Sequence, residues 1–251
     1  MTTLRTLLGR GLVSGGLGGL AAGAFSYLLA EPVMDRAVRL ESARVAAEGA
    51  HSHAGEHHAE VFTRATQHLG LVVGTTVAGL ALGVLFALAY ALLYRRDPTT
   101  DPWGRSIRLA AAAFTGVYLL PFLRYPANPP GGGDPATIQV RTATWLGAIV
   151  ISLLGLVAAW RAQAHLAQRG APARVRQLAT AGLLAVTLVL LFLLPGTADP
   201  IEVPAPLLWG FRLLSVSTQA VLWGVLGVTF GLLAEHTARA ARAPSPTTAP
   251  A

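Results

Sequence analysis

The sequence contains no cysteine and no lysine, and only 12% of its residues are charged. Without cysteine, disulfides, thiolate metal sites and cysteine nucleophiles are all excluded. Soluble domains carry about a quarter charged residues, so this chain has roughly half the usual charge for solvation. Hydrophobic residues make up 53% of the chain, and the mean hydropathy is +0.53. These values are typical of a membrane protein.

Several functional motifs are also missing from the sequence. It has no phosphate-binding Gly-Lys motif, and it has neither a nucleophile elbow nor a two-histidine zinc protease motif. No carboxylate lies in the middle of an apolar run, so a proton relay of the usual kind is not predicted. The net charge of +7 comes from arginines placed singly or in pairs, unlike a nucleic-acid footprint. We therefore expect no enzyme, no prosthetic group and no nucleic-acid partner.

Long apolar runs dominate what is present, and each is long enough to cross a bilayer, which takes about 17 to 25 residues. Because backbone groups in lipid must hydrogen-bond internally, such runs form helices. The sequence thus predicts an all-α bundle of six transmembrane helices in contact with lipid. The third run is the weakest candidate, because it is short and carries Pro121 near its end. The six runs are Gly11–Ala30, Leu69–Tyr94, Ile107–Leu123, Ala143–Trp160, Leu178–Leu194 and Leu207–Ala234.

Arginines are concentrated in the N-terminal tail, the second and fourth connections and the C-terminal tail. By the positive-inside rule, both termini are predicted to be cytoplasmic. We expect tails at 1–10 and 235–251, the second disordered, around one transmembrane domain at 11–234 in the inner (plasma) membrane. A basic start followed by an apolar run and AGA at 22–24 also fits a cleaved signal peptide. Cleavage would leave five spans, as would a third run that does not cross.

Glycine recurs every four residues in the first run, at Gly11, Gly15, Gly19 and Gly23. Small residues at this spacing let another helix approach closely. The pairs at 70 and 74, 79 and 83, and 227 and 231 repeat the pattern. We interpret all of them as helix-packing sites in a compact bundle.

The predicted first extracytoplasmic loop, residues 31–68, is rich in histidine and acidic residues. In HSHAGEHHAE, residues 51–60, a helix would place His53 and His57 one turn apart on one face. Imidazole and carboxylate ligands without thiols suit divalent cobalt, nickel or zinc. A His-rich tract in a solvated loop also binds metals loosely with no dedicated role, and both interpretations stay open. The candidate metal ligands are His51, His53, His57, His58, Glu31 and Asp134.

The last run carries Arg212, the only charge placed well inside an apolar run. Ser215 and Gln219 follow on the same helical face, with Thr218 beside them. The stripe is interpreted either as the lining of a pathway or as a set of interhelical hydrogen bonds. For Arg212 we favour an ion pair with an acid at 134, 199 or 202, because a bare positive charge would repel an entering cation.

Prolines and glycines dominate YPANPPGGGDP, residues 125–135, in the predicted second extracytoplasmic loop at 124–142. Each proline fixes φ and removes a backbone N–H donor. The unpaired backbone carbonyls of this segment cannot face lipid, so the segment lies in water or against protein. We expect a rigid loop that shapes the mouth of the bundle and holds Asn128 and Asp134 in set positions. The mouth candidates are Tyr125, Asn128, Pro129 and Pro130, together with Arg212, Ser215, Thr218 and Gln219.

The segment RYPANPPGGGDPATIQVRT, residues 124–142, resembles the hallmark loop of the CbtA family of predicted cobalt transporter subunits. The Gly-rich first run followed by AEPVMDRAVRLE, residues 30–41, is similar as well. The resemblance implies cobalt uptake linked to cobalamin synthesis, with Co²⁺ as the transported ion. It also implies a small single-span partner with a His-rich end, the CbtB-type subunit. The family is usually described with five spans, one fewer than the six runs predict.

Two other functions stay open from the residues alone. A non-transporting membrane partner or sensor would bind metal outside and report it or hand it on. A carrier of anions or metal chelates is suggested by Arg124, Arg141 and Arg212, which all fall on the predicted outer side.

Overall fold

The computed structural model describes residues 3–49, 64–94, 101–129, 137–196 and 203–240, and every regular element in these ranges is helical. Six of the described helices are long and apolar enough to cross a membrane, which confirms the predicted all-α fold with six spans. Leucines and valines point outward along them; Leu92, Leu178 and Leu193 are each more than 70% exposed. Such surfaces suit lipid, where hydrocarbon replaces water around the helices.

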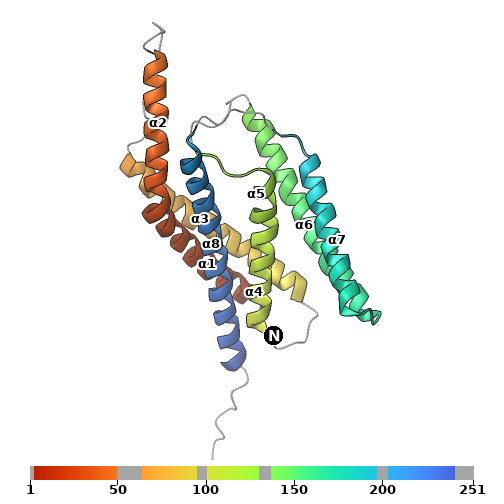
Figure 1. Cartoon of the computed structure of the whole chain (residues 1–251). Helices are drawn as coiled ribbons and strands as arrows, with labels where there is room; N and C mark the ends of the chain where they lie inside the picture. Colours follow the sequence, from red (N-terminus) through yellow and green to blue (C-terminus); the bar gives the residue numbers. More distant parts are fainter. Residues whose placement is uncertain (1–2, 50–63, 95–100, 130–136, 197–202, 241–251) are drawn as a thin grey trace, which may run out of the picture. The chain divides into compact units, whose positions relative to one another are not determined.

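The first long helix runs without a break through α1 (Leu4–Phe25), the π-helical turn η1 (Ser26–Ala30) and α2 (Glu31–Gly49) (Figure 1). Thr3 caps its start by accepting a hydrogen bond from the Thr6 backbone N–H. The helix continues through Pro32, which does not begin a new helix. A proline ring clashes with the carbonyl four residues earlier in an α-helix, and here that residue, Leu28, lies in the wider π turn at 26–30.

The third predicted span uses the same arrangement in α4 (Pro102–Ala113), the π-helical turn η2 (Phe114–Leu119) and α5 (Leu120–Arg124). The Leu120 N–H donates to the Thr115 carbonyl oxygen, five residues back, and Pro121 follows immediately. The helix begins where Asp101 accepts a hydrogen bond from the Gly104 N–H at 2.8 Å. Pro121 therefore does not end the span, which covers 23 residues from Pro102 to Arg124.

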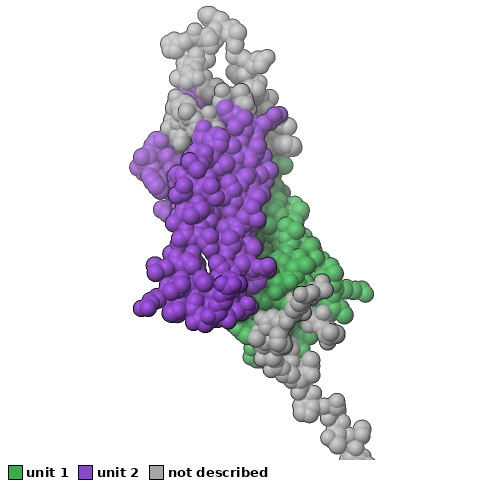
Figure 2. All heavy atoms as spheres, turned by 90° about the vertical axis from the view of Figure 1, so that its right-hand side faces the viewer, with its two compact units in different colours: residues 1–27, 61–111, 218–251 green, residues 28–60, 112–217 purple. Residues whose placement is uncertain are grey.

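The described chain forms two compact units, coloured separately in Figure 2. Unit 1 contains residues 1–27, 61–111 and 218–251, and unit 2 contains residues 28–60 and 112–217. Unit 1 therefore holds α1, α3 (Arg64–Tyr94), most of α4 and the second part of α8 (Ala205–Ala240). Unit 2 holds α2, η2, α5, α6 (Ile138–Gln168), α7 (Ala173–Leu193) and the first part of α8.

In unit 1, α1 and α3 cross in contact through their glycines (Figure 1). A methyl group added to Gly15 would overlap the Gly79 carbonyl oxygen, and one added to Gly83 would overlap that of Gly11. The predicted packing role of these glycines is confirmed. It is wrong for Gly70 and Gly74, where an added methyl group meets no described atom within 4 Å.

The pair at 227 and 231 also packs as predicted, against α4. A methyl group on Gly227 would overlap the Ala110 side chain, and the Ser106 hydroxyl donates to the Gly227 carbonyl oxygen at 2.7 Å. The core of unit 1 is completed by the rings of Phe86 and Phe230, whose centroids lie 5.1 Å apart in an edge-to-face arrangement. Small residues thus set the close helix contacts, and aromatic rings fill the space beside them.

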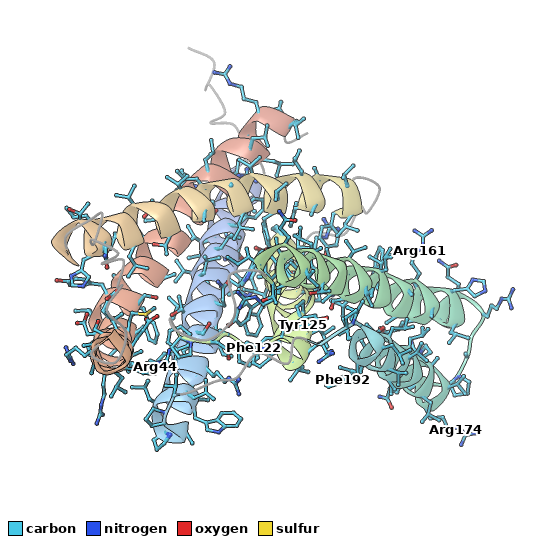
Figure 3. All side chains as sticks on the ribbon, turned by 90° about the horizontal axis from the view of Figure 1, so that it is seen from above. Arg44, Phe122, Tyr125, Arg161, Arg174 and Phe192 are labelled. Carbon is cyan, nitrogen blue, oxygen red and sulfur yellow. The ribbon has the colours of Figure 1, made fainter. Side chains whose placement is uncertain are left out.

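In unit 2, α6 and α7 form an antiparallel pair joined by a tight turn (Figure 1). Gly170 has φ of +70°, and its N–H and that of Ala171 bond back to Ala167 and Leu166 at 3.0 Å each. This is the Schellman arrangement, in which glycine adopts the left-handed conformation and Pro172 then prevents the helix from continuing. Figure 3 shows Arg161 and Arg174 on α6 and α7 toward this turn.

Candidate functional site

Unit 2 contains a pocket of about 690 Å³. Its walls come from η2 and α5, the loop that follows α5, the first two turns of α6, and α8. The loop is the start of the proline-rich segment identified in the sequence. The lining residues are Tyr118, Phe122, Arg124, Tyr125, Pro126, Ala127, Asn128, Ile138, Arg141, Thr142, Trp145 and Arg212.

Arg212 holds the loop in place from α8. Its Nε donates to the Ala127 carbonyl oxygen at 3.3 Å, and its terminal NH2 group donates to Oδ1 of Asn128 at 3.0 Å. The guanidinium also lies over the Trp209 ring, 5.6 Å from its centroid. Pro129, the next residue of the loop, is fully buried. These contacts involve the described part of the segment, residues 125–129; that the segment is rigid stays a prediction.

The residues just before the loop clamp the end of α7. Arg124 donates to the Leu194 carbonyl oxygen at 2.6 Å, and the Tyr125 hydroxyl donates to the Pro195 carbonyl oxygen at 2.7 Å. The last carbonyls of a helix lack partners within the helix, so outside donors stabilise them. The Arg124 guanidinium lies 5.0 Å from the Tyr125 ring centroid and 5.8 Å from that of Phe192. The cation is thus fixed by rings as well as by its hydrogen bond.

A stack of rings follows one face of the third span into the pocket. Phe114, Tyr118 and Phe122 are four residues apart, and their successive centroids are separated by 6.1 and 5.5 Å. The Tyr118 hydroxyl is hydrogen-bonded to the Ser215 hydroxyl of α8 at 2.6 Å. This bond joins two helices of unit 2 beside the pocket.

Among the described lining residues of the pocket, all formal charges are positive. Arg124, Arg141 and Arg212 line it, and no aspartate, glutamate or histidine is among its described lining residues. Arginine stays protonated at every physiological pH, so the three guanidiniums carry three positive charges. Each is half-buried. The site is therefore an electropositive pocket with aromatic walls.

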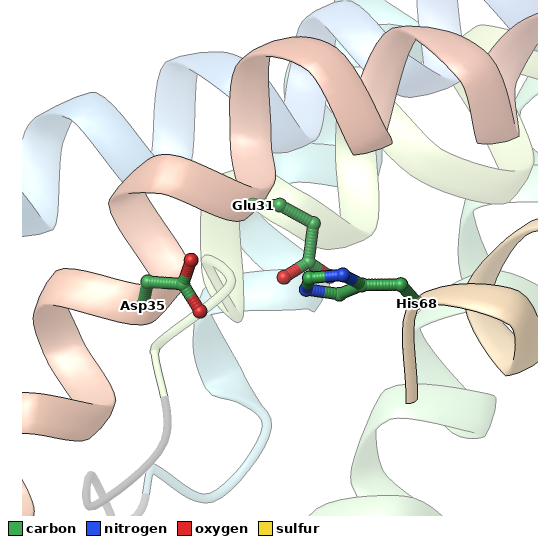
Figure 4. A group of neighbouring side chains, drawn as sticks. All are labelled: Glu31, Asp35 and His68. Carbon is green, nitrogen blue, oxygen red and sulfur yellow. The ribbon is translucent and has the colours of Figure 1, made fainter. Parts of the chain in front are cut away.

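The predicted acidic ligand Glu31 lies in the first turn of α2, one turn before Asp35 (Figure 4). Both side chains are half-buried, and both make contacts with other groups. His68, also drawn in Figure 4, lies in α3, where its ring meets the Tyr27 ring edge to face with the centroids 5.4 Å apart.

The other predicted metal ligands, His51, His53, His57, His58 and Asp134, lie outside the described residues, as does the mouth residue Pro130. Their grouping around a metal stays a prediction. The same holds for the predicted ion pair of Arg212, whose candidate acids at 134, 199 and 202 are also outside those ranges. Of the mouth residues, Tyr125, Asn128 and Arg212 line the pocket, and Pro129 is buried beside it.

The polar stripe of α8 is divided between different partners. Ser215 pairs with Tyr118 in unit 2, whereas Thr218 pairs with the Ser26 hydroxyl at 3.0 Å in unit 1. Gln219 is half-buried in unit 1. The interpretation of the stripe as a set of interhelical hydrogen bonds requires bonds of this kind, and Ser215 and Thr218 each make one. Whether the stripe also lines a pathway stays a prediction.

The sequence-based list of site residues omitted much of the pocket wall, including Tyr118, Phe122, Thr142 and Trp145. Two signals were available. Phe114, Tyr118 and Phe122 repeat at helical spacing, and Arg141 precedes Trp145 by one turn. Both patterns are also common in helices that only pack, so neither indicates a pocket without the fold.

Comparison with known families assigns the chain. The model of the family described as "Probable cobalt transporter subunit (CbtA)" matches residues 4–235, which include five of the six membrane-capable helices in full and nearly all of the sixth. The chain belongs to the CbtA family. No curated protein and no solved structure gives a significant match to it. As a member of the CbtA family with six membrane-capable helices, it is a multi-pass membrane protein of a transporter-subunit family, and its electropositive pocket lies within the matched region.

Proposed function

We propose that this chain is the membrane-embedded subunit of a cobalt uptake system that supplies cobalamin biosynthesis. The observation that carries the proposal is the CbtA family match over residues 4–235, which reach into all six membrane-capable helices. Six helices of this kind provide a spanning bundle. A subunit needs a partner, and the small His-rich CbtB-type protein is the partner we propose.

In this proposal the chain lies in the plasma membrane with both termini in the cytoplasm, because arginines concentrate in the alternate loops that this orientation places inside. The His-rich tract at 51–58 then lies outside, where it captures divalent cobalt. Imidazole nitrogens are suitable ligands for Co²⁺. The chain itself carries out no reaction and holds no prosthetic group.

Uptake of radioactive cobalt tests the proposal. Cells lacking other cobalt importers would express the chain alone, the CbtB-type partner alone, or both, at limiting cobalt. We expect accumulation above the background only with both. Equal background accumulation in all three strains, with the chain present in the membrane, contradicts transport. If the purified chain still binds cobalt in that case, the result favours a membrane metal sensor.

A further inference from the structure

The electropositive pocket of unit 2 does not suit a bare metal cation. Co²⁺ is held in proteins by imidazole, carboxylate or thiolate groups, and the described lining residues offer none of these. Their only formal charges are the three positive charges of Arg124, Arg141 and Arg212. Like charges focused in a cleft with apolar walls repel an entering cation and attract an anion.

The size of the pocket points to an organic ligand. Its volume of about 690 Å³ falls within the range of small-molecule sites, roughly 300 to 1,000 Å³. Metal–ligand distances are only about 2 Å, so a bare ion leaves most of this space unfilled. The rings of Tyr118, Phe122 and Trp145 offer flat apolar walls for a carbon skeleton. A compact molecule with several charged groups fits both the space and the lining.

The arginines are already held in position for such a molecule. Arg212 uses its Nε and one terminal nitrogen to hold the loop, and Arg124 donates through one terminal nitrogen to Leu194. A guanidinium has five N–H donors, so further donors remain on both groups. The Nε of Arg124 is buried and has no hydrogen-bond partner among the described residues. A buried donor of this kind is uncommon and calls for a ligand or water.

Electrostatics favour the same conclusion. Arg124 and Arg212 are half-buried, and their described hydrogen-bond partners are neutral carbonyl and amide oxygens, so a nearby negative charge would stabilise both. Carboxylates bind guanidinium groups in pairs of parallel hydrogen bonds, which makes arginine the usual partner of planar anions. A ligand with two or three carboxylates can offset the charges of Arg124 and Arg212 at once.

We propose that the pocket formed by Arg124, Arg141, Arg212 and the surrounding rings binds a small polycarboxylate anion, and that cobalt enters it as an anionic carboxylate chelate. The second half rests on the proposed cobalt uptake, whereas the first half stands on the pocket alone. Carboxylate oxygens that bind the metal and those that bind arginine would belong to the same molecule. Such a chelate also removes the repulsion that a bare cation would meet.

Calorimetric titration of the purified full-length chain in neutral detergent tests the anion site. Citrate, cobalt(II) citrate and inorganic phosphate are the three probes. We expect both citrate forms to bind, and phosphate to bind more weakly because it engages fewer guanidiniums. R141Q, which removes one charge from the pocket wall, should weaken citrate binding about tenfold, the usual scale for one lost charged hydrogen bond.

The chain offers matched controls for this charge change. Arg161 and Arg174 are exposed on α6 and α7 of the same unit and do not line the pocket (Figure 3). R161Q and R174Q should leave citrate affinity unchanged. A second pocket variant, N128D, keeps an acceptor for Arg212 and adds a negative charge, so it should also weaken binding about tenfold. Thermal unfolding of each variant establishes that it is folded.

Three results overturn the anion site: no citrate binding by the wild-type chain, equal losses in R141Q and R161Q, or tighter binding of phosphate than of citrate. The transport assay separates this inference from the proposed function. If the chain supports cobalt uptake but binds no citrate, the anion site is wrong and the proposed function stands. If citrate binding depends on Arg141 but cobalt is not taken up in any form, the proposed function is wrong and the anion site stands.

Discussion

Arg212 and Asn128 are joined by a hydrogen bond of 3.0 Å that connects the last transmembrane helix to the proline-rich loop, 84 residues away in the chain. A second bond from the same guanidinium reaches the Ala127 carbonyl oxygen. An arginine inside an apolar run is costly to insert. Here its cost is offset by bonds that hold one wall of the pocket.

Glutamine is shorter than arginine and has no guanidinium, so Arg212→Gln should lose the hydrogen bonds to Ala127 and Asn128. A typical hydrogen bond contributes about 0.5 to 1.5 kcal/mol, so we expect a loss of about 1 to 3 kcal/mol in unfolding free energy. Denaturant unfolding in detergent measures this, and R161Q is the matched control because Arg161 is exposed and lies outside the pocket. Equal stability of R212Q and R161Q would contradict the role of Arg212 in holding the loop.

The contact between α1 and α3 predicts opposite outcomes for two identical changes. Gly15→Ala places a methyl group on the Gly79 carbonyl oxygen and should destabilise the fold by about 1 to 3 kcal/mol through overpacking. Gly74→Ala, on the same pair of helices, meets open space and should be neutral or slightly stabilising. Thermal unfolding of the two variants side by side decides the matter. Similar melting points would show that the close helix approach is absent.

The pair formed by Tyr118 and Ser215 allows packing to be separated from a pathway role. A double-mutant cycle with Tyr118→Phe and Ser215→Ala should give a coupling energy of about 0.6 kcal/mol, the usual size between membrane helices. If the bond is structural only, cobalt uptake should follow stability across the four proteins. Loss of uptake in Ser215→Ala without loss of stability would instead support a pathway lining.

The His-rich tract can be tested without altering the bundle. Replacing His51, His53, His57 and His58 together by Gln keeps polarity but removes imidazole ligands. If the tract captures cobalt, the concentration for half-maximal uptake should rise several-fold while the maximal rate stays unchanged. Unchanged uptake at limiting cobalt would remove the capture role. A variant with the neighbouring Ser52 replaced by Gln controls for changes in the loop itself.

Orientation is open to direct labelling because the chain has no cysteine of its own. Single cysteines at His57 and at Arg169, in opposite predicted compartments, should react differently with a maleimide that cannot cross membranes. We expect intact cells to label the first position only and lysed cells to label both. Labelling of Arg169→Cys alone in intact cells would reverse the proposed orientation.

Much of the helical framework could be predicted from the sequence, because hydropathy and length decide whether a segment spans a bilayer. The packing role of Gly15 could also be predicted, since small residues at every fourth position share one face. Gly70 and Gly74 have the same spacing and pack against nothing described. The sequence spacing shows which face of a helix carries small residues. It does not show whether another helix packs on that face, because that depends on how all the helices are arranged.

The pocket was beyond sequence reasoning for a similar reason. Arg212 was expected to pair with an acid, yet the described partners are an amide oxygen and a backbone carbonyl. Arg124 and Arg141 are 17 residues apart in the sequence, and a loop separates them. The three arginines line one pocket in the fold, where residues 127 and 128 of the loop contact Arg212 of α8. The sequence indicated the signs of the charges, and the fold determined their grouping.

The π-helical turn η2 has a consequence for how the pocket wall is oriented. Such a turn contains one residue more than the α-helical path it replaces, and each residue of an α-helix advances by about 100° around the axis. Phe122, Arg124 and Tyr125 all follow η2 in the chain. Removing one residue from this turn would therefore restore an ordinary α-helical path and keep all three on their present face of the helix. The span can thus lose one residue between 114 and 119 without moving the guanidinium and the rings away from their present neighbours, whereas a deletion in a purely α-helical segment would rotate everything after it by about 100°.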